Sequence, residues 1–196
     1  MHIPLEIIEL SKTYGSKKAV RNISFKLNKN EIIGILGPNG CGKTTTIGMI
    51  LGLLKPCEGK VLINGLEIEK QRVNLLNELN FISPYIELPK KLTVKQNLEV
   101  YGRLYDVKQL KIKIDYLCEK LRLNEFINKV TGELSSGQKN RVSLAKSIIN
   151  DPSVLLLDEP TASLDPETGD FVRSFLEEYQ KENKTSILLA SHNMSE

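Results

Sequence analysis

The stretch EIIGILGPNGCGKTTTIGMIL, residues 31–51, decides the fold of this 196-residue chain. An apolar run at residues 32–36 breaks into a glycine-rich loop, residues 37–44, that fits the phosphate-binding P-loop pattern GxxxxGK[ST]. The apolar run is typical of a strand buried on both faces, and residues 45–51 can continue as a helix. The sequence therefore predicts a strand, a phosphate-binding loop and a helix in succession.

The chemistry of this loop begins with its backbone. Its glycines permit close approach, so that successive N–H groups turn onto phosphate oxygens in front of a helix N-terminus. Lys43 is expected to reach the β- and γ-phosphates of a nucleotide, and the hydroxyl of Thr44 to ligate Mg²⁺. The residues expected to contact the nucleotide here are Gly37, Pro38, Asn39, Gly40, Cys41, Gly42, Lys43, Thr44 and Thr45.

Composition limits the classes to consider. A hydrophobic content of 40% can fill the core of one large domain, or of a domain with a subdomain. The net charge of +3 and the scattered Lys and Arg give no indication of nucleic-acid binding. The longest apolar stretch is far shorter than the roughly 18 residues of a membrane span, and no secretion signal is visible, so we expect a cytosolic chain. Three cysteines without metal-like spacing indicate reduced thiols.

Before the P-loop, two antiparallel strands are expected at residues 5–10 and 20–27. The loop between them carries Tyr14, for which stacking on a nucleobase and partial burial in the loop are equally open interpretations. After the P-loop helix, Asn64 and Gly65 predict a tight hairpin between residues 61–63 and 66–68.

The periodicity becomes helical at about residues 93–129. Residues 93–96 form a capping box, and two apolar stripes follow, which predict two packed helices in a small subdomain inserted between the two halves of the chain. The stripes are Val94, Leu98, Tyr101 and Tyr105, then Leu110, Ile114, Leu117 and Leu121.

Two buried strands of parallel type are expected at residues 154–157 and 187–190. Asp165 and Pro166 begin the helix between them, as N-cap and first helical residue, and this helix is expected to bury Phe171, Val172, Phe175, Leu176 and Tyr179. The pattern is that of a doubly wound α/β fold, which binds ligands at the carboxyl ends of its strands.

Polar residues follow both of these strands. Asp158 is expected to hold Mg²⁺ through the Thr44 hydroxyl or a metal-bound water, and Glu159 to polarise the water that attacks the γ-phosphate. His192, after the last strand, could hydrogen-bond that phosphate. An acidic pair at a helix N-terminus and a surface histidine are the alternative interpretations.

The segment LSSGQKNRVSLAKSIIN, residues 134–150, predicts a polar loop and a helix opened by Gly137. The N-terminus of this helix is a second anion-binding end. A well-capped helix would explain Ser135 and Ser136 without any ligand.

In chain order, GPNGCGKT, LSSGQ, LLLDEP, SLD and ASH resemble the nucleotide-binding subunit of an ATP-binding cassette (ABC) transporter, over nearly the whole chain. LTVKQNLEVYGRLYDV and the ending ASHNMSE are most similar to the ABC-2 type exporter ATPases. The resemblance implies an α/β P-loop NTPase with a mostly parallel core sheet, an N-terminal antiparallel β region and an inserted helical subdomain. Residues 1–90 and 151–196 would form the ATP-binding core, and about 91–150 the helical subdomain.

The same resemblance implies a head-to-tail dimer with two ATP molecules, each held between one P-loop and the partner's signature motif, here Ser135, Gly137 and Gln138. It implies adenine stacking for Tyr14. Hydrolysis, with Lys43, Glu159 and His192 as catalytic residues, would drive a transmembrane export permease from the cytoplasmic face of the cell membrane. Residues 163–165, which include Asp165, would form the loop that links the two ATP sites.

Three features depart from the family pattern. Ser136 stands where glycine is usual, and the chain ends at Glu196, earlier than the family domain. Between Phe81 and Thr93 the expected glutamine is missing, and Ser83, Pro84 or Glu87 lies nearest to its place. These departures leave a regulatory nucleotide-binding module with little turnover as an alternative. A soluble ABC-type ATPase acting on ribosomes or DNA is less favoured, because it would usually bring a second cassette or a long insertion.

Overall fold

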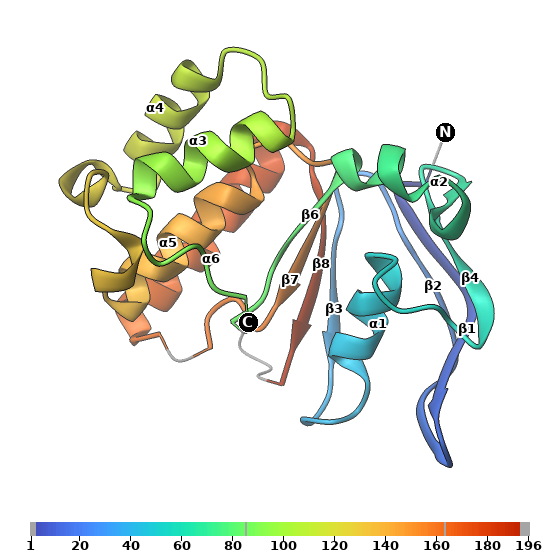
Figure 1. Cartoon of the computed structure of the whole chain (residues 1–196). Coiled ribbons are helices and arrows are strands. Elements are labelled where there is room, and N and C mark those ends of the chain that lie inside the picture. Colours follow the sequence, from blue (N-terminus) through green and yellow to red (C-terminus); the bar gives the residue numbers. More distant parts are fainter. Residues whose placement is uncertain (1–2, 85, 163, 193–196) are drawn as a thin grey trace.

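The computed structural model describes residues 3–84, 86–162 and 164–192. Within these ranges an antiparallel sheet has the strand order β2-β1-β4-β5, and a parallel sheet has the order β3-β8-β7-β6 (Figure 1). The predicted α/β class, with a parallel core sheet and an N-terminal antiparallel region, is confirmed. The strands are β1 (Leu5–Tyr14), β2 (Lys17–Leu27), β3 (Ile32–Leu36), β4 (Glu58–Ile63), β5 (Leu66–Glu67), β6 (Leu79–Ile82), β7 (Val154–Asp158) and β8 (Ser186–Ser191).

The helices lie on both faces of the parallel sheet. The antiparallel sheet and α1 cover one face, and α3 to α6 cover the other (Figure 1). None of the helices in the described ranges has the length and apolar character needed to cross a membrane. They are α1 (Lys43–Ile50), α2 (Ile68–Leu75), α3 (Val94–Leu104), α4 (Leu110–Lys120), α5 (Ser136–Ser147) and α6 (Pro166–Asn183).

The inner strand β7 contributes side chains to two hydrophobic cores, one on each face of the parallel sheet. Leu155 and Leu157 pack with the α3–α6 side, whereas Val154 and Leu156 pack with α1 and the antiparallel sheet. This division follows from the alternation of side chains along a strand. Because both faces are covered, every residue of β7 is buried, as its continuous apolar run predicts.

The outer strand β3 corrects one prediction. Residues 32–36 do form the strand before the P-loop, but it is not buried on both faces. Ile33 and Ile35 pack on the α1 side, whereas Ile32 and Leu36 are 45% and 53% exposed. Among the described residues β3 pairs with β8 alone, and α6 packs over β7 and β8 instead of β3. An apolar run cannot reveal whether a helix covers its second face.

The first hairpin is longer than the sequence predicts. β1 continues to Tyr14 and β2 begins at Lys17, with Gly15 at a φ of 56° in the turn. Exposed polar side chains extend the pair beyond its apolar residues. Tyr14 therefore ends a strand and does not lie within a loop.

The second hairpin forms as predicted at Asn64 and Gly65, whose positive φ values of 51° and 82° suit a two-residue turn. Its second strand ends at Glu67, because Ile68 begins α2 instead. The sequence interpretation missed α2 and β6. In α2 only Ile68 and Leu75 are buried, so no regular apolar stripe marks the helix.

The helix caps follow the sequence signals. The predicted capping box of α3 is confirmed, because Thr93 Oγ1 accepts from Gln96 N at 3.1 Å and Gln96 Oε1 accepts from Thr93 N at 2.9 Å. Asp165 caps α6, and Pro166 is its first residue. Of the five α6 side chains expected in the core, Phe171 is only partly buried.

A polar network joins α5 to β6. Asn80, which is 1% exposed, donates to Asn150 Oδ1 at 2.8 Å and accepts from Lys146 Nζ at 3.0 Å. The Lys146 ammonium lies 5.2 Å from the ring centres of both Phe81 and Tyr101. Burial lowers the pKa of Lys146 to about 8. This network fixes the C-terminal end of α5 against β6, the strand that Ser83 follows.

Candidate nucleotide site

Near its C-terminal end the P-loop has a tight backbone arrangement that requires glycine. Gly42, at φ 105°, caps the N-terminus of α1, and a Cβ there would lie 2.3 Å from the carbonyl oxygen of Ala19 on β2. Gly40 has a φ of 82° and open space around it. The loop is thus packed closely against the first hairpin at one glycine and is open at another.

Lys43 lies folded into the loop. Its side chain is 6% exposed, and its Nζ donates to the carbonyl oxygens of Gly37 at 2.6 Å and Pro38 at 3.3 Å. The same Nζ lies 3.6 Å from Oε1 of Glu159. The lysine therefore connects the P-loop backbone with the carboxylate that follows β7.

Asp158 and Thr44 come together as predicted. The Thr44 hydroxyl donates to Oδ2 of Asp158 at 3.1 Å. Burial raises the pKa of Asp158, and the charge of Glu159 adds to this effect. The hydrogen bonds from Thr44 and Ser83 and the charge of Lys43 act in the opposite direction. The result is a buried carboxylate whose negative charge is incompletely compensated.

Glu159 is held in an unusual backbone conformation. Its φ is 51°, in the left-handed region, and its N–H donates to the carbonyl oxygen of Ala190 at 2.8 Å. Such strain is common at functional sites. Oε2 of Glu159 lies 2.7 Å from Nδ1 of His192, whereas Oε1 is buried without a hydrogen-bond donor within the described part of the chain. The ends of β7 and β8 thus bring Glu159 and His192, which were predicted separately, into contact.

A cavity of about 410 Å³ lies over these groups. Tyr14 contributes to its wall from the end of β1 and is 47% exposed, with Lys12 Nζ 5.4 Å from the ring centre. The exposed ring is thereby available at the rim of the phosphate loop. Predicted residues that line the cavity are Tyr14, Asn39, Gly40, Gly42, Lys43, Thr44, Thr45, Asp158 and Glu159. Cys41 is exposed, beside Gly37.

The predicted signature residues lie elsewhere, at the N-terminus of α5, and do not line this cavity. Ser135 Oγ accepts from Gln138 N at 3.2 Å, and Gln138 Oε1 accepts from Ser135 N at 3.1 Å. The helix therefore begins at Ser136 with a capping box, one residue before the predicted opening at Gly137. Both side chains are engaged within their own helix end.

Asp165 also serves as a helix cap, with Oδ1 accepting from Thr168 N at 2.9 Å. This backbone hydrogen bond is the main reason that the pKa of Asp165 is lowered. Ser163, predicted in the same linking loop, lies outside the described residues. The single chain thus does not bring Asp165 to the P-loop cavity.

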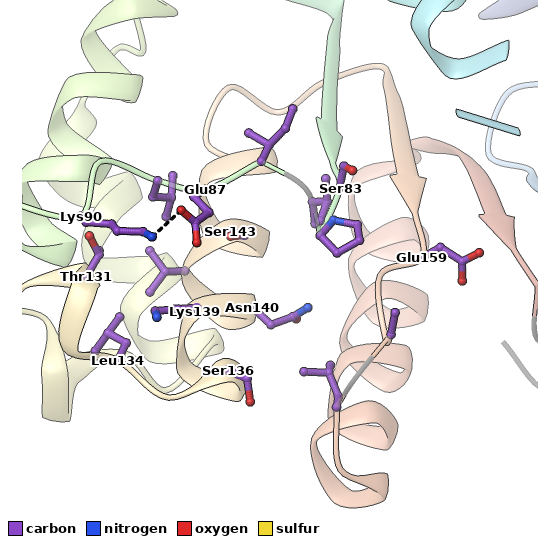
Figure 2. A pocket seen from close by; sticks show the side chains of 17 residues that line it. Ser83, Glu87, Lys90, Thr131, Leu134, Ser136, Lys139, Asn140, Ser143 and Glu159 are labelled. Atoms are coloured by element: carbon purple, nitrogen blue, oxygen red, sulfur yellow. Dashed lines mark ion pairs between the residues drawn. The ribbon is translucent and has the colours of Figure 1, made fainter. Parts of the chain in front are cut away.

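A second cavity, of about 210 Å³, extends from Glu159 to the α5 side (Figure 2). Ser83 and Ser136 contribute to its lining from opposite sides. The sequence indicates Ser83 only as one of the residues nearest to the place of the missing glutamine. The available signal was its place directly after β6, whose last residue, Ile82, pairs with Leu157 just before Asp158.

A parallel sheet with a P-loop, a Thr–Asp pair and a Glu–His pair at one edge defines a P-loop nucleotide-binding domain. The family model described as "ABC transporter" matches residues 20–162. The chain belongs to this family, as an ATP-binding cassette.

Two relatives show the extent of the likeness. The chain is 36% identical over 199 residues to the ABC transporter ATP-binding protein NatA of Bacillus subtilis, covering 98% of this chain and 80% of that protein. It is 38% identical over 197 residues to the Nod factor export ATP-binding protein I of Rhizobium johnstonii, covering 99% and 63%.

Solved structures agree with this assignment. The chain matches a dimeric ATP-binding cassette in a post-hydrolysis state, bound to ADP and Pi, with a TM-score of 0.88 and 25% identity over 97% of this chain and 89% of the other. It also matches cbiO1 from Clostridium perfringens, with a TM-score of 0.84 and 30% identity over 98% and 80%.

Proposed function

We propose that this chain is the ATP-binding and ATP-hydrolysing subunit of a membrane ABC exporter, and that ATP-driven dimerisation powers the exporter. The observation that carries this proposal is Glu159. Its carboxylate lies at the phosphate loop on a strained backbone, with Oε2 against His192. Oε1 is buried, accepts no hydrogen bond from the described residues and lies 3.6 Å from the Lys43 ammonium. Most buried polar side-chain atoms have a hydrogen-bond partner, so an oxygen without one at this position favours a functional role.

The nucleotide is proposed to bind along the P-loop, residues 37–45, with its adenine against Tyr14. Thr44 and Asp158 fit Mg²⁺, because hydroxyl and carboxylate oxygens are its preferred protein ligands and because the charge of the buried Asp158 lacks full compensation. When bound, Mg²⁺ neutralises charge that develops on the phosphate oxygens.

The residues of this chain have separate tasks in hydrolysis. Glu159 orients the attacking water and accepts its proton at Oε1, which accepts no hydrogen bond from the described residues. His192 holds Oε2 and thereby fixes the carboxylate. The Lys43 ammonium moves from the carbonyl oxygens of Gly37 and Pro38 onto the β- and γ-phosphates.

The second half of each ATP site comes from a second cassette. Ser135, Gly137 and Gln138 would contact the γ-phosphate across the dimer, with Asp165 close to the interface. Support comes from their position at a helix N-terminus remote from the chain's own P-loop, and from the dimeric cassette that this chain resembles. We propose a homodimer in the ATP state and expect no nucleic acid to bind.

The relatives named for export and the transporter complex of cbiO1 support a transmembrane permease as partner, with the chain peripheral on the cytoplasmic face of the cell membrane. Residues 91–150 are proposed as the helical subdomain that passes motion to the permease. Residues 1–90 and 151–196 are proposed as the ATP-binding core.

Phosphate release in excess Mg-ATP tests the enzymatic part. Glu159→Gln should lower turnover by roughly 10²- to 10⁴-fold, the usual contribution of a general base. Glu177→Gln, at an exposed position on α6, serves as the matched control and should leave turnover unchanged. Slow turnover that Glu159→Gln does not alter would refute the proposal. It would favour a regulatory nucleotide-binding module, the alternative that the missing glutamine motivates.

A further inference from the structure

Asp158 accepts hydrogen bonds from hydroxyls on two different parts of the fold. One comes from Thr44 at the start of α1, and the other from Ser83, the first residue after β6. The parallel register explains the second contact, because Ile82 pairs with Leu157 and the next residues of the two strands lie side by side. Figure 2 shows Ser83 and Glu159 at the neighbouring ends of these strands.

Ser83, whose hydroxyl contacts Asp158, has a restricted backbone conformation. Pro84 follows it, and a residue before proline is restricted to extended backbone conformations. Its side chain is partly buried at the cavity shared with Glu159. The hydroxyl is therefore presented to the buried carboxylate by a restrained backbone.

The neighbouring residues offer no comparable oxygen to Asp158. Pro84 has neither a side-chain oxygen nor a backbone N–H. Glu87 is 64% exposed, and its carboxylate pairs with Lys90 at 2.7 Å (Figure 2). Ser83, Pro84 and Glu87 are the residues nearest to the place of the missing glutamine. Of these three, Ser83 alone has a hydrogen bond to Asp158, the predicted metal ligand.

We propose that the Ser83 hydroxyl is a further oxygen ligand of the magnesium ion in the nucleotide-bound site. The proposal rests on the function proposed above. The Ser83 hydroxyl would keep donating its proton to Asp158 while a lone pair of its oxygen faces the metal, and the chain that runs from Ser83 toward Thr93 would thereby be tied to the nucleotide. That connection ends at Thr93, the cap of α3, so metal binding positions the helical region as well.

Manganese binding tests the proposal without turnover. Mn²⁺ replaces Mg²⁺ in the presence of a non-hydrolysable ATP analogue, and free Mn²⁺ is measured by electron paramagnetic resonance. Ser83→Ala should weaken Mn²⁺ binding about tenfold or more, the scale of losses when groups around a metal are removed. Ser143→Ala, at the same cavity but on α5, is the matched control and should bind Mn²⁺ like the parent chain.

A thiol at the same position distinguishes direct ligation from a hydrogen bond through Asp158. Ser83→Cys should produce cadmium–thiolate absorption with Cd²⁺ and the analogue, beyond any signal of the parent's own cysteines, because soft thiolates prefer soft metals. Ser143→Cys should not.

Two outcomes distinguish a failure of the Ser83 proposal from a failure of the proposed function. If the parent binds Mn²⁺ with the analogue while both Ser83 variants behave like their Ser143 controls, the role of Ser83 is refuted and the proposed site survives. If the parent itself shows no analogue-dependent Mn²⁺ binding, the proposed function fails together with it.

Discussion

Replacing Gly42 by alanine should destabilise the nucleotide-free chain strongly, and the structure separates two causes. The first is the left-handed φ of 105°, which costs a residue with a side chain about 2 kcal/mol. The second is the new Cβ, which would lie 2.3 Å from Ala19 O, well inside the 3.0 Å that real Cβ contacts respect. Relieving such an overlap costs about 2 kcal/mol more.

Two other glycines provide the matched comparison. Gly40→Ala meets no atom within 4 Å but has a φ of 82°, so only the first cost of about 2 kcal/mol applies. Gly34→Ala, in β3, has neither problem and should be close to neutral. In thermal unfolding without nucleotide, the sum of about 4 kcal/mol at Gly42 corresponds to a fall in Tm of roughly 8–16 °C, and Gly40→Ala to half of that. Equal Tm values for the Gly40 and Gly42 variants would refute the packing of the P-loop against β2.

Two further predictions concern buried charges. The pKa of Lys146 is lowered to about 8, so the buried charged side chain destabilises the folded chain below pH 8. This destabilisation is relieved as pH rises from 8 toward 10.5, the pKa of an unperturbed lysine. The unfolding free energy of the parent should therefore rise relative to Lys146→Met by about 2 kcal/mol between pH 7 and pH 10 in urea titrations, and a pH-independent difference would contradict this. Burial raises the pKa of the Asp158 carboxyl in the folded chain. This group therefore stabilises the folded chain fully at pH values below its pKa in the unfolded chain, and the stabilisation is lost as pH rises through its pKa in the folded chain. Asp158→Asn should raise the Tm of the nucleotide-free chain by a few degrees at pH 7 while abolishing analogue-dependent Mn²⁺ binding, and a lowered Tm would count against it.

The P-loop, the capping box of α3 and the buried strands were predictable because each follows from local residue chemistry. Thr93 and Gln96 specify a cap within four residues, and the glycines at 40 and 42 specify positive φ. The parallel order of β6, β7 and β8 then brings their carboxyl ends to one edge, which places Asp158, Glu159 and His192 together. Motif and topology reinforce each other at this edge.

What could not be predicted depends on tertiary environment. The exposure of Ile32 and Leu36 reflects the missing cover on one side of β3, which an apolar run does not encode. α2 lacks an apolar stripe, and the hydrogen bond of Ser83 arises from strand register across 75 residues of chain. The signature residues are a different case, because their capping box is visible in the sequence while their proposed ligand belongs to another subunit.

The most direct test of the composite ATP site is light scattering on the Glu159→Gln variant with and without Mg-ATP. Removing the base blocks hydrolysis, so bound ATP remains on both faces and holds two cassettes together. We predict that the molar mass doubles on addition of Mg-ATP and that Ser135→Arg in the same background prevents the increase. A variant that binds ATP in equilibrium dialysis and yet keeps the mass of a monomer would contradict ATP-driven dimerisation of this chain.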